Sequence, residues 1–154
     1  MSQQTAKFVY VTWIRTTRDK VFEAIVKPEI ARRYWAHENV SDWKPGSTWR
    51  HVNNDPARTV HVLGKVVEVS PPNRLVMTWA SPENEADPAK YSRVTFELEQ
   101  KADMVKLTVV HDELEPGSAM EQGISQGWPL VLSSLKSLLE TGNGIDIYKV
   151  KAAA

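Results

Sequence analysis

Up to residue 112, most of the chain alternates between apolar and polar positions, which is the pattern of β-strands with one buried face. The alternation predicts strands over residues 7–15, after the turn at residues 44–47, and over residues 59–69, 75–80, 93–100 and 105–112. The segment 7–15 carries large apolar side chains on both of its faces. We therefore expect both faces of this first strand to be covered.

Two parts of the chain have helical spacing instead. Thr16 with Asp19 three residues later fits a capping box, and Pro28 ends this first helix and opens a second short helix over residues 28–36. Near the C-terminus, apolar residues recur every three or four positions from Met120 to Leu139 and form one stripe. The pattern predicts two short helices after the first strand and one long C-terminal helix.

The long helix contains the sequence Gly-Trp-Pro at residues 127–129. Pro129 has no amide hydrogen, so a continuous helix would lose the hydrogen bond to Ser125. Either the helix begins at this proline, or one helix from Ala119 bends at residues 127–129. The apolar stripe extends back beyond the proline, which favours the bent helix with Trp128 facing a cavity.

A first strand, two helices, a run of strands and a final helix are typical of an α+β protein. We expect a curved antiparallel β-sheet of about six or seven strands that grips the long C-terminal α-helix. No repeat, low-complexity tract or linker interrupts the pattern, so residues 1–154 are expected to form a single domain. A sheet larger than the helix that covers it would leave a cavity between the two.

Composition excludes several classes of protein. The 19 basic and 19 acidic residues balance, so no electrostatic attraction to nucleic acid or to an anionic membrane is expected. The absence of cysteine excludes disulfides, thiolate metal sites and a cysteine nucleophile. No signal peptide and no membrane-spanning run of apolar residues is recognisable, so a cytoplasmic location is expected.

Six segments in series resemble one protein superfamily. They are VFEAIVKPEIARRYW (21–35), SDWKPGSTW (41–49), GKVVEVSPPNRLVMTW (64–79), SRVTFELE (92–99), LTVVHDELEPGS (107–118) and GWPLVLSSLKSLLETG (127–142). Together they resemble the START-like, helix-grip superfamily called SRPBCC, in the branch of homologues of the activator of heat-shock-protein-90 ATPase. The resemblance implies a curved sheet and a long helix around an apolar cavity.

This resemblance does not imply one function, because the superfamily includes lipid carriers, hormone receptors, polyketide cyclases and chaperone activators. The chaperone activator proper carries a further N-terminal domain that engages the chaperone. The present sequence begins at the first strand of the helix-grip domain, so activity on a chaperone is not expected to follow from the resemblance alone.

Strand alternation and the helical stripe give a candidate ligand pocket. The sheet would contribute Trp49, His51, Met77, Trp79, Phe96, Leu98, Leu107, Val109 and His111, and the helix Met120, Ile124, Trp128, Val131, Leu132 and Leu135. A wall of this kind, apolar with aromatic plates and two imidazoles, suits a hydrophobic or aromatic small molecule. The alternative is a solid core filled by tryptophans.

No catalytic residue, metal site or cofactor is predicted. His111 and Asp112 are adjacent on a strand and point to opposite faces, so without a β-bulge they cannot share a metal ion. No G-x-S-x-G motif and no glycine-rich phosphate loop is present. His37 and His61 are interpreted as surface residues, and the acidic stretch at residues 112–115 as a solvated loop.

Three functions remain open. The favoured one is a binding protein that holds an apolar, aromatic or lipid-like molecule and carries out no chemistry. The second is a stress-response module that contacts a chaperone or another protein. The third is an enzyme of the cyclase or aromatase kind, guided by pocket shape and one histidine or acid. Exposed strand edges are also compatible with a homodimer.

Overall fold

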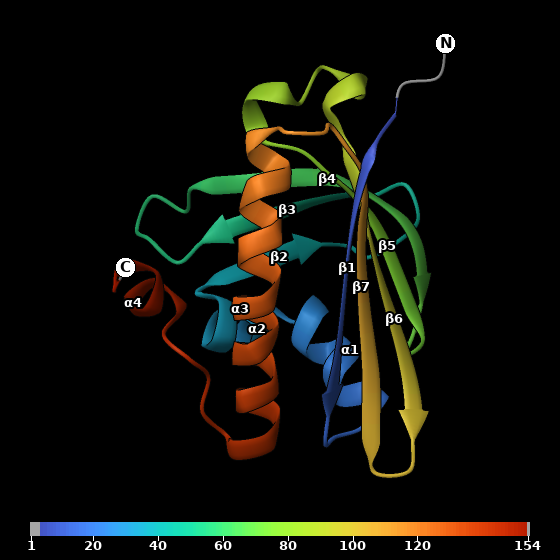
Figure 1. The fold of residues 1–154 in the computed structure, drawn as a ribbon, viewed down its shortest axis with the longest axis vertical. Coiled ribbons are helices and arrows are strands. Elements are labelled where there is room, and N and C mark those ends of the chain that lie inside the picture. The colour runs from blue at the N-terminus through green and yellow to red at the C-terminus, as the bar shows by residue number, and fades with distance from the viewer. Residues whose placement is uncertain (1–3, 154) are drawn as a thin grey trace.

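The computed structural model describes residues 4–153, in which a curved antiparallel sheet wraps around a long helix (Figure 1). The strands are β1 (Ala6–Ile14), β2 (His37–Ser41), β3 (Thr48–Asn53), β4 (Val60–Ser70), β5 (Arg74–Trp79), β6 (Ser92–Lys101) and β7 (Met104–Leu114). The helices are α1 (Arg18–Val26), α2 (Pro28–Trp35), α3 (Ala119–Thr141) and α4 (Ile147–Ala152), with two short 3₁₀ turns at Pro82–Asn84 and Pro88–Lys90.

The seven strands lie in the order β1-β7-β6-β5-β4-β3-β2. From β2 to β7, each strand pairs with the strand that follows it along the chain, and β1 pairs with β7. Inward residues meet across the ladders, as in the pairs of Phe96 with Val109 and Leu98 with Leu107. Their side chains are buried against α3 and form the core between helix and sheet. The predicted α+β fold, with its long helix and two short helices after the first strand, is confirmed.

The prediction that both faces of the first strand are covered is wrong. Val9, Val11 and Trp13 on β1 are 49%, 44% and 41% exposed. On the opposite face, Phe8 and Tyr10 pack against the core. Apolar side chains on both faces of a strand do not show which face is covered. The outer face of this edge strand is an exposed row of apolar side chains.

The two short helices begin and end close to the predicted positions. The N-cap of α1 is Thr17 rather than Thr16, because the Thr17 hydroxyl accepts from the amide of Lys20. Proline opens α2 at its first position. Ala36 then adopts a left-handed conformation, with φ of 58°, and turns the chain directly into β2. This turn places the end of α2 beside the start of β2.

Helix α3 is continuous from Ala119 to Thr141 with Pro129 inside it, which confirms the longer of the two alternatives. Ser118 caps its N-terminus by accepting from the amide of Glu121, and Gly142 ends it with φ of 88°. The predicted bend at residues 127–129 stays a prediction. Trp128 faces inward and is 3% exposed.

Helix α4 was not predicted. After α3, the chain runs past α2, and Ser134 Oγ donates to the backbone oxygen of Ile145 and accepts from its amide. Asp146 then caps α4 by accepting from the amide of Lys149. This places α4 next to the end of α2 and the start of β2 (Figure 1). No helix in the described part of the chain is long and apolar enough to cross a membrane.

Candidate functional site: an aromatic cleft between helices and sheet

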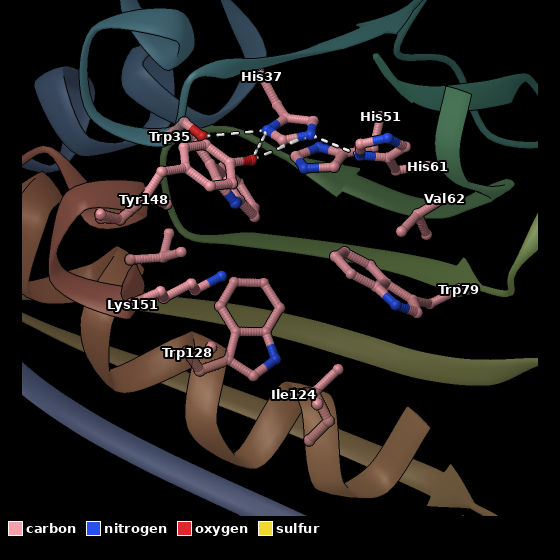
Figure 2. Close-up of a pocket in the computed structure, with 14 residues that line it drawn as sticks. Trp35, His37, His51, His61, Val62, Trp79, Ile124, Trp128, Tyr148 and Lys151 are labelled. Atoms are coloured by element: carbon pink, nitrogen blue, oxygen red, sulfur yellow. Dashed lines mark hydrogen bonds between the residues drawn. The ribbon is translucent and has the colours of Figure 1, made fainter. Parts of the chain in front are cut away.

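A cleft of about 320 Å³ lies between α3 and α4 on one side and strands β2 to β5 on the other (Figure 2). Its lining is mostly aromatic or apolar, and its polar groups are three histidines, one tyrosine and one lysine. The lining residues are Trp35, His37, His51, His61, Val62, Trp79, Gly123, Ile124, Gly127, Trp128, Val131, Ile147, Tyr148 and Lys151. The volume is at the lower end of small-molecule sites.

Three tryptophans from three separate elements form the walls. Trp35 is the last residue of α2, Trp79 the last of β5, and Trp128 lies in the middle of α3. The ring of Trp128 is 5.6 Å from that of Trp35 and 5.5 Å from that of Trp79, centroid to centroid. These tilted contacts are favourable aromatic geometry and leave flat ring surface facing the cleft.

A buried histidine behind the cleft holds Trp128 in place. Trp128 Nε1 donates a hydrogen bond to His111 Nδ1 over 3.0 Å, and His111 Nε2 lies 2.8 Å from Ser92 Oγ. An indole nitrogen only donates, so the proton of a neutral His111 is on Nε2. His111 therefore donates to Ser92, whose hydroxyl donates to the backbone oxygen of Trp79.

This arrangement excludes a Ser92–His111 nucleophile and base. His111 Nε2 already carries a proton and cannot accept the one on Ser92. Burial lowers the pKa of His111 to about 3, so the ring is neutral near pH 7 and is no general acid either. His111 is fully buried and acts as a structural hydrogen-bond partner.

Three histidines lie together on the sheet side of the cleft, one each from β2, β3 and β4 (Figure 2). The rings of His37 and His51 stack with centroids 4.4 Å apart and planes only 2° apart. His37 Nδ1 lies 3.1 Å from the backbone oxygen of Trp35, which only accepts, so a neutral His37 is protonated there. Its Nε2 then accepts from Nδ1 of His61 over 2.8 Å.

Burial is the main cause that keeps the two stacked rings neutral. It lowers the pKa of His37, and it lowers the pKa of His51 well below the ordinary value, with further lowering by the neighbouring histidines. Because the rings of His37 and His51 are parallel, their in-plane nitrogen lone pairs do not point to one common position. Within residues 4–153, no group of three or more His, Cys, Asp or Glu side chains is arranged to hold a metal ion.

The interpretation of His37 as a surface residue is wrong, since it is 4% exposed. The segment His37–Ser41 has no clear alternation, so its residue pattern indicates neither β2 nor the burial of its first residue. His61 is exposed, as expected, but its ring contributes to the edge of the cleft.

Five of the predicted pocket residues line the cleft: His51, Trp79, Ile124, Trp128 and Val131. The others do not. Trp49, Met77, Phe96, Leu98, Leu107, Val109, His111, Leu132 and Leu135 are buried in the core, and Met120 lies half-buried beside a separate polar depression. Alternation identifies the inward face of a strand, but α3 covers most of that face directly and leaves the cleft only at one end.

Two glycines on α3 leave open space on the helix side of the cleft. Gly123 and Gly127 are four positions apart and both line the cleft. A Cβ atom added at either would meet no atom within 4 Å, so the space beside them is open. Glycine inside a helix costs about 1 kcal/mol relative to alanine, and two such positions on one face are costly for the helix.

Helix α4 supplies residues that sequence reasoning missed. The Tyr148 hydroxyl lies 3.0 Å from His37 Nδ1, and Lys151 Nζ lies 5.5 Å from the centre of the Tyr148 ring. The signal that could have found this helix is Asp146, an N-cap residue directly before apolar Ile147. Its contribution gives the cleft a polar and basic end.

Comparison with known proteins agrees with this architecture. The family model described as Activator of Hsp90 ATPase homolog 1-like protein matches residues 15–140. A search of curated protein sequences gave no significant match.

Several solved structures share the fold. The Aha1 dimer from Colwellia psychrerythraea is 19% identical with a TM-score of 0.74, over 90% of this chain and 99% of that one. CalU16 from Micromonospora echinospora is 19% identical with a TM-score of 0.70, over 96% and 82%. DynU16, from the dynemicin biosynthetic locus, is 21% identical with a TM-score of 0.69, over 90% and 48%. At these identities the likeness establishes the helix-grip fold alone.

Proposed function

The chain belongs to the family of Activator of Hsp90 ATPase homolog 1-like proteins, and we propose that it binds a hydrophobic or aromatic small molecule in the tryptophan cleft. The observation that carries this proposal is the open space of about 320 Å³ beside two helix glycines and three indole rings. A helix that only had to pack would gain stability from alanine at both glycine positions.

The chemistry of the lining supports binding without catalysis. The nearest histidine and serine pair is locked in the wrong tautomer for nucleophilic attack, as described for His111 and Ser92. The lining residues described here include no carboxylate that could act as an acid or a base. The cleft therefore offers aromatic surface and a few hydrogen-bonding groups, which suit the holding and orienting of a ligand.

The test is to fill the cleft without unfolding the protein. We expect Gly127→Leu to reduce the affinity for naphthalene at least tenfold, as measured by quenching of tryptophan fluorescence, because the new side chain takes the space of the ligand. Its unfolding free energy should not fall, since an added Cβ meets nothing within 4 Å and leucine favours a helix over glycine by about 1 kcal/mol.

Ser133→Leu is the matched control, because Ser133 lies on the exposed face of the same helix. It should leave naphthalene binding unchanged. Equal binding by wild type and Gly127→Leu, with both folded, would contradict ligand binding in this cleft.

A second candidate function, contact with another protein, is favoured by the outer face of β1. Val9, Val11 and Trp13 form an exposed apolar row on an edge strand, and edge strands are common sites of chain association. The related Colwellia protein was solved as a dimer. A second copy of this chain is the simplest partner for such a row.

A further inference from the structure

His51 lies at the inner end of the cleft, packed between other rings. It is on β3 and 5% exposed, with its ring stacked on His37 and 4.5 Å from the ring of Trp35, centroid to centroid. Such packing leaves the ring no freedom to turn. Which of its two nitrogens carries the proton therefore decides what the cleft offers to a ligand.

Asn39 determines which nitrogen of His51 carries the proton. Its Nδ2 donates to the backbone oxygen of Ile25 over 2.9 Å. Ile25 is in the last turn of α1, where carbonyl groups have no partner inside the helix and need one from elsewhere. Because that carbonyl only accepts, the amide of Asn39 cannot be reversed, and its Oδ1 faces His51 Nδ1 at 2.8 Å. His51 is accordingly protonated on Nδ1, and Nε2 carries a lone pair.

The lone pair on Nε2 has no hydrogen-bond partner among residues 4–153, where the single polar contact of the ring is that of Nδ1 with Asn39. In the same part of the chain, the unpaired polar side-chain atoms that are sealed from solvent are Trp79 Nε1 and Asp112 Oδ1. His51 Nε2 is therefore unpaired but not sealed. Since His51 lines the cleft, the cleft is where this acceptor is open.

We infer that His51 Nε2 accepts a hydrogen bond from a neutral hydroxyl group on an aromatic ligand, and that His51 thereby selects hydroxylated molecules over the same skeleton without the hydroxyl. This inference rests on the proposed binding function. The walls of the cleft are indoles, which suit a flat aromatic body. A carboxylate has no proton to donate near neutral pH, and Lys151 at the open end opposes a cationic donor.

The expected selectivity follows from leaving a buried acceptor unpaired. A ligand without the hydroxyl removes Nε2 from water and returns no hydrogen bond, which weakens binding by about 5- to 150-fold. The same ratio should disappear when the acceptor is removed from the protein. His51→Phe removes both ring nitrogens while keeping an aromatic ring to stack on His37.

The experiment measures the affinity of three probes by quenching of tryptophan fluorescence at about pH 7.5, where 2-naphthol is a neutral phenol. The probes are 2-naphthol, naphthalene and 2-methoxynaphthalene, whose ether oxygen cannot donate. Wild type should bind 2-naphthol at least fivefold more tightly than either of the others. His51→Phe should bind 2-naphthol and naphthalene equally. The control Ser133→Leu, on the exposed face of α3 and outside the cleft, should keep the preference.

The outcomes separate this inference from the proposed function. Equal binding of all three probes by wild type would overturn the role of His51 and leave ligand binding intact. A preference for 2-naphthol that persists in folded His51→Phe would overturn it as well, because another group would then be the acceptor. The comparison of 2-naphthol with 2-methoxynaphthalene in wild type tests whether a donated proton is needed. If His51→Phe fails to fold, His51→Leu, which also lacks Nε2, takes its place in assigning the acceptor. No binding of any probe would contradict the proposed function and the inference together.

Discussion

Acid should destabilise this protein well before its carboxylates titrate, because His111 is buried in neutral form. Its pKa is about 3 in the folded protein, lowered by burial, against about 6.5 in the unfolded chain. Below pH 6.5 the unfolded chain binds a proton that the folded protein does not, so the unfolding free energy falls as pH falls. The fall is about 1.4 kcal/mol per pH unit and ends near pH 3. From pH 7.5 to pH 5, His111 alone should remove about 2 kcal/mol.

The other buried histidines act in the same direction. Burial also lowers the pKa of His37 and, further, that of His51, so both favour the unfolded chain as pH falls. Carboxylates with lowered pKa values, such as those of Glu38 and Glu140, add a loss of the same sign only at lower pH. The range from about pH 7.5 to pH 5 therefore isolates the histidines.

The assay is urea denaturation across this pH range for wild type and His111→Gln. Glutamine can accept from Trp128 and donate to Ser92, as His111 does, but it has no proton to bind. The variant should lose about 2 kcal/mol less than wild type between pH 7.5 and pH 5. Val109→Ala is the control: it removes buried volume on the same strand without a titrating group, so its profile should run parallel to that of wild type. Parallel profiles for wild type and His111→Gln would refute the reasoning.

Two further predictions concern glycines and the outer face of the sheet. Gly123→Ala should raise the unfolding free energy by about 0.5–1 kcal/mol in urea denaturation, because its Cβ meets open space. Gly64→Ala should lower it by several times that amount, because its Cβ would lie 2.0 Å from the backbone oxygen of Thr78; equal effects would contradict the account of the cleft wall. If β1 carries a dimer interface, sedimentation should show wild-type dimers at micromolar concentration and Val11→Lys monomers. Monomers in both would count against that surface.

The fold could be predicted because its main signals are local and strong. Segments such as residues 93–100 alternate over many positions, and α3 carries an apolar stripe over most of its length. Short elements gave no such signal. β2 has five residues and α4 has six, and tertiary contacts such as that between Tyr148 and His37 connect the two. Tertiary contacts decide structure where a segment is too short for its own pattern to do so.

The candidate site was predictable only in part for the same reason. The sequence pointed to His51 and Trp128 through their inward positions on a strand and a helix. It could not point to His37, since β2 has no clear alternation, and the only pointer to α4 and Tyr148 was the N-cap residue Asp146, which does not define a helix by itself. Alternation also could not separate core from cleft: Phe96 and His51 share the inward face, but α3 covers one and leaves the other beside open space.

The cost of α3 as a helix links its sequence to the cleft. Two glycines and one proline in its interior cost about 5 kcal/mol relative to alanine at the same positions, which is comparable to the whole stability of many domains. All three lie within residues 123–129, and the rest of the helix has none. Gly123, Gly127 and Trp128 all face the cleft. The glycines leave the space and the tryptophan forms one of its walls. The residues that disfavour a helix are thus confined to the stretch of α3 that faces the cleft. C-terminal to this stretch, the helix packs into the core through leucines. A segment that served packing alone would carry no such difference between its two halves.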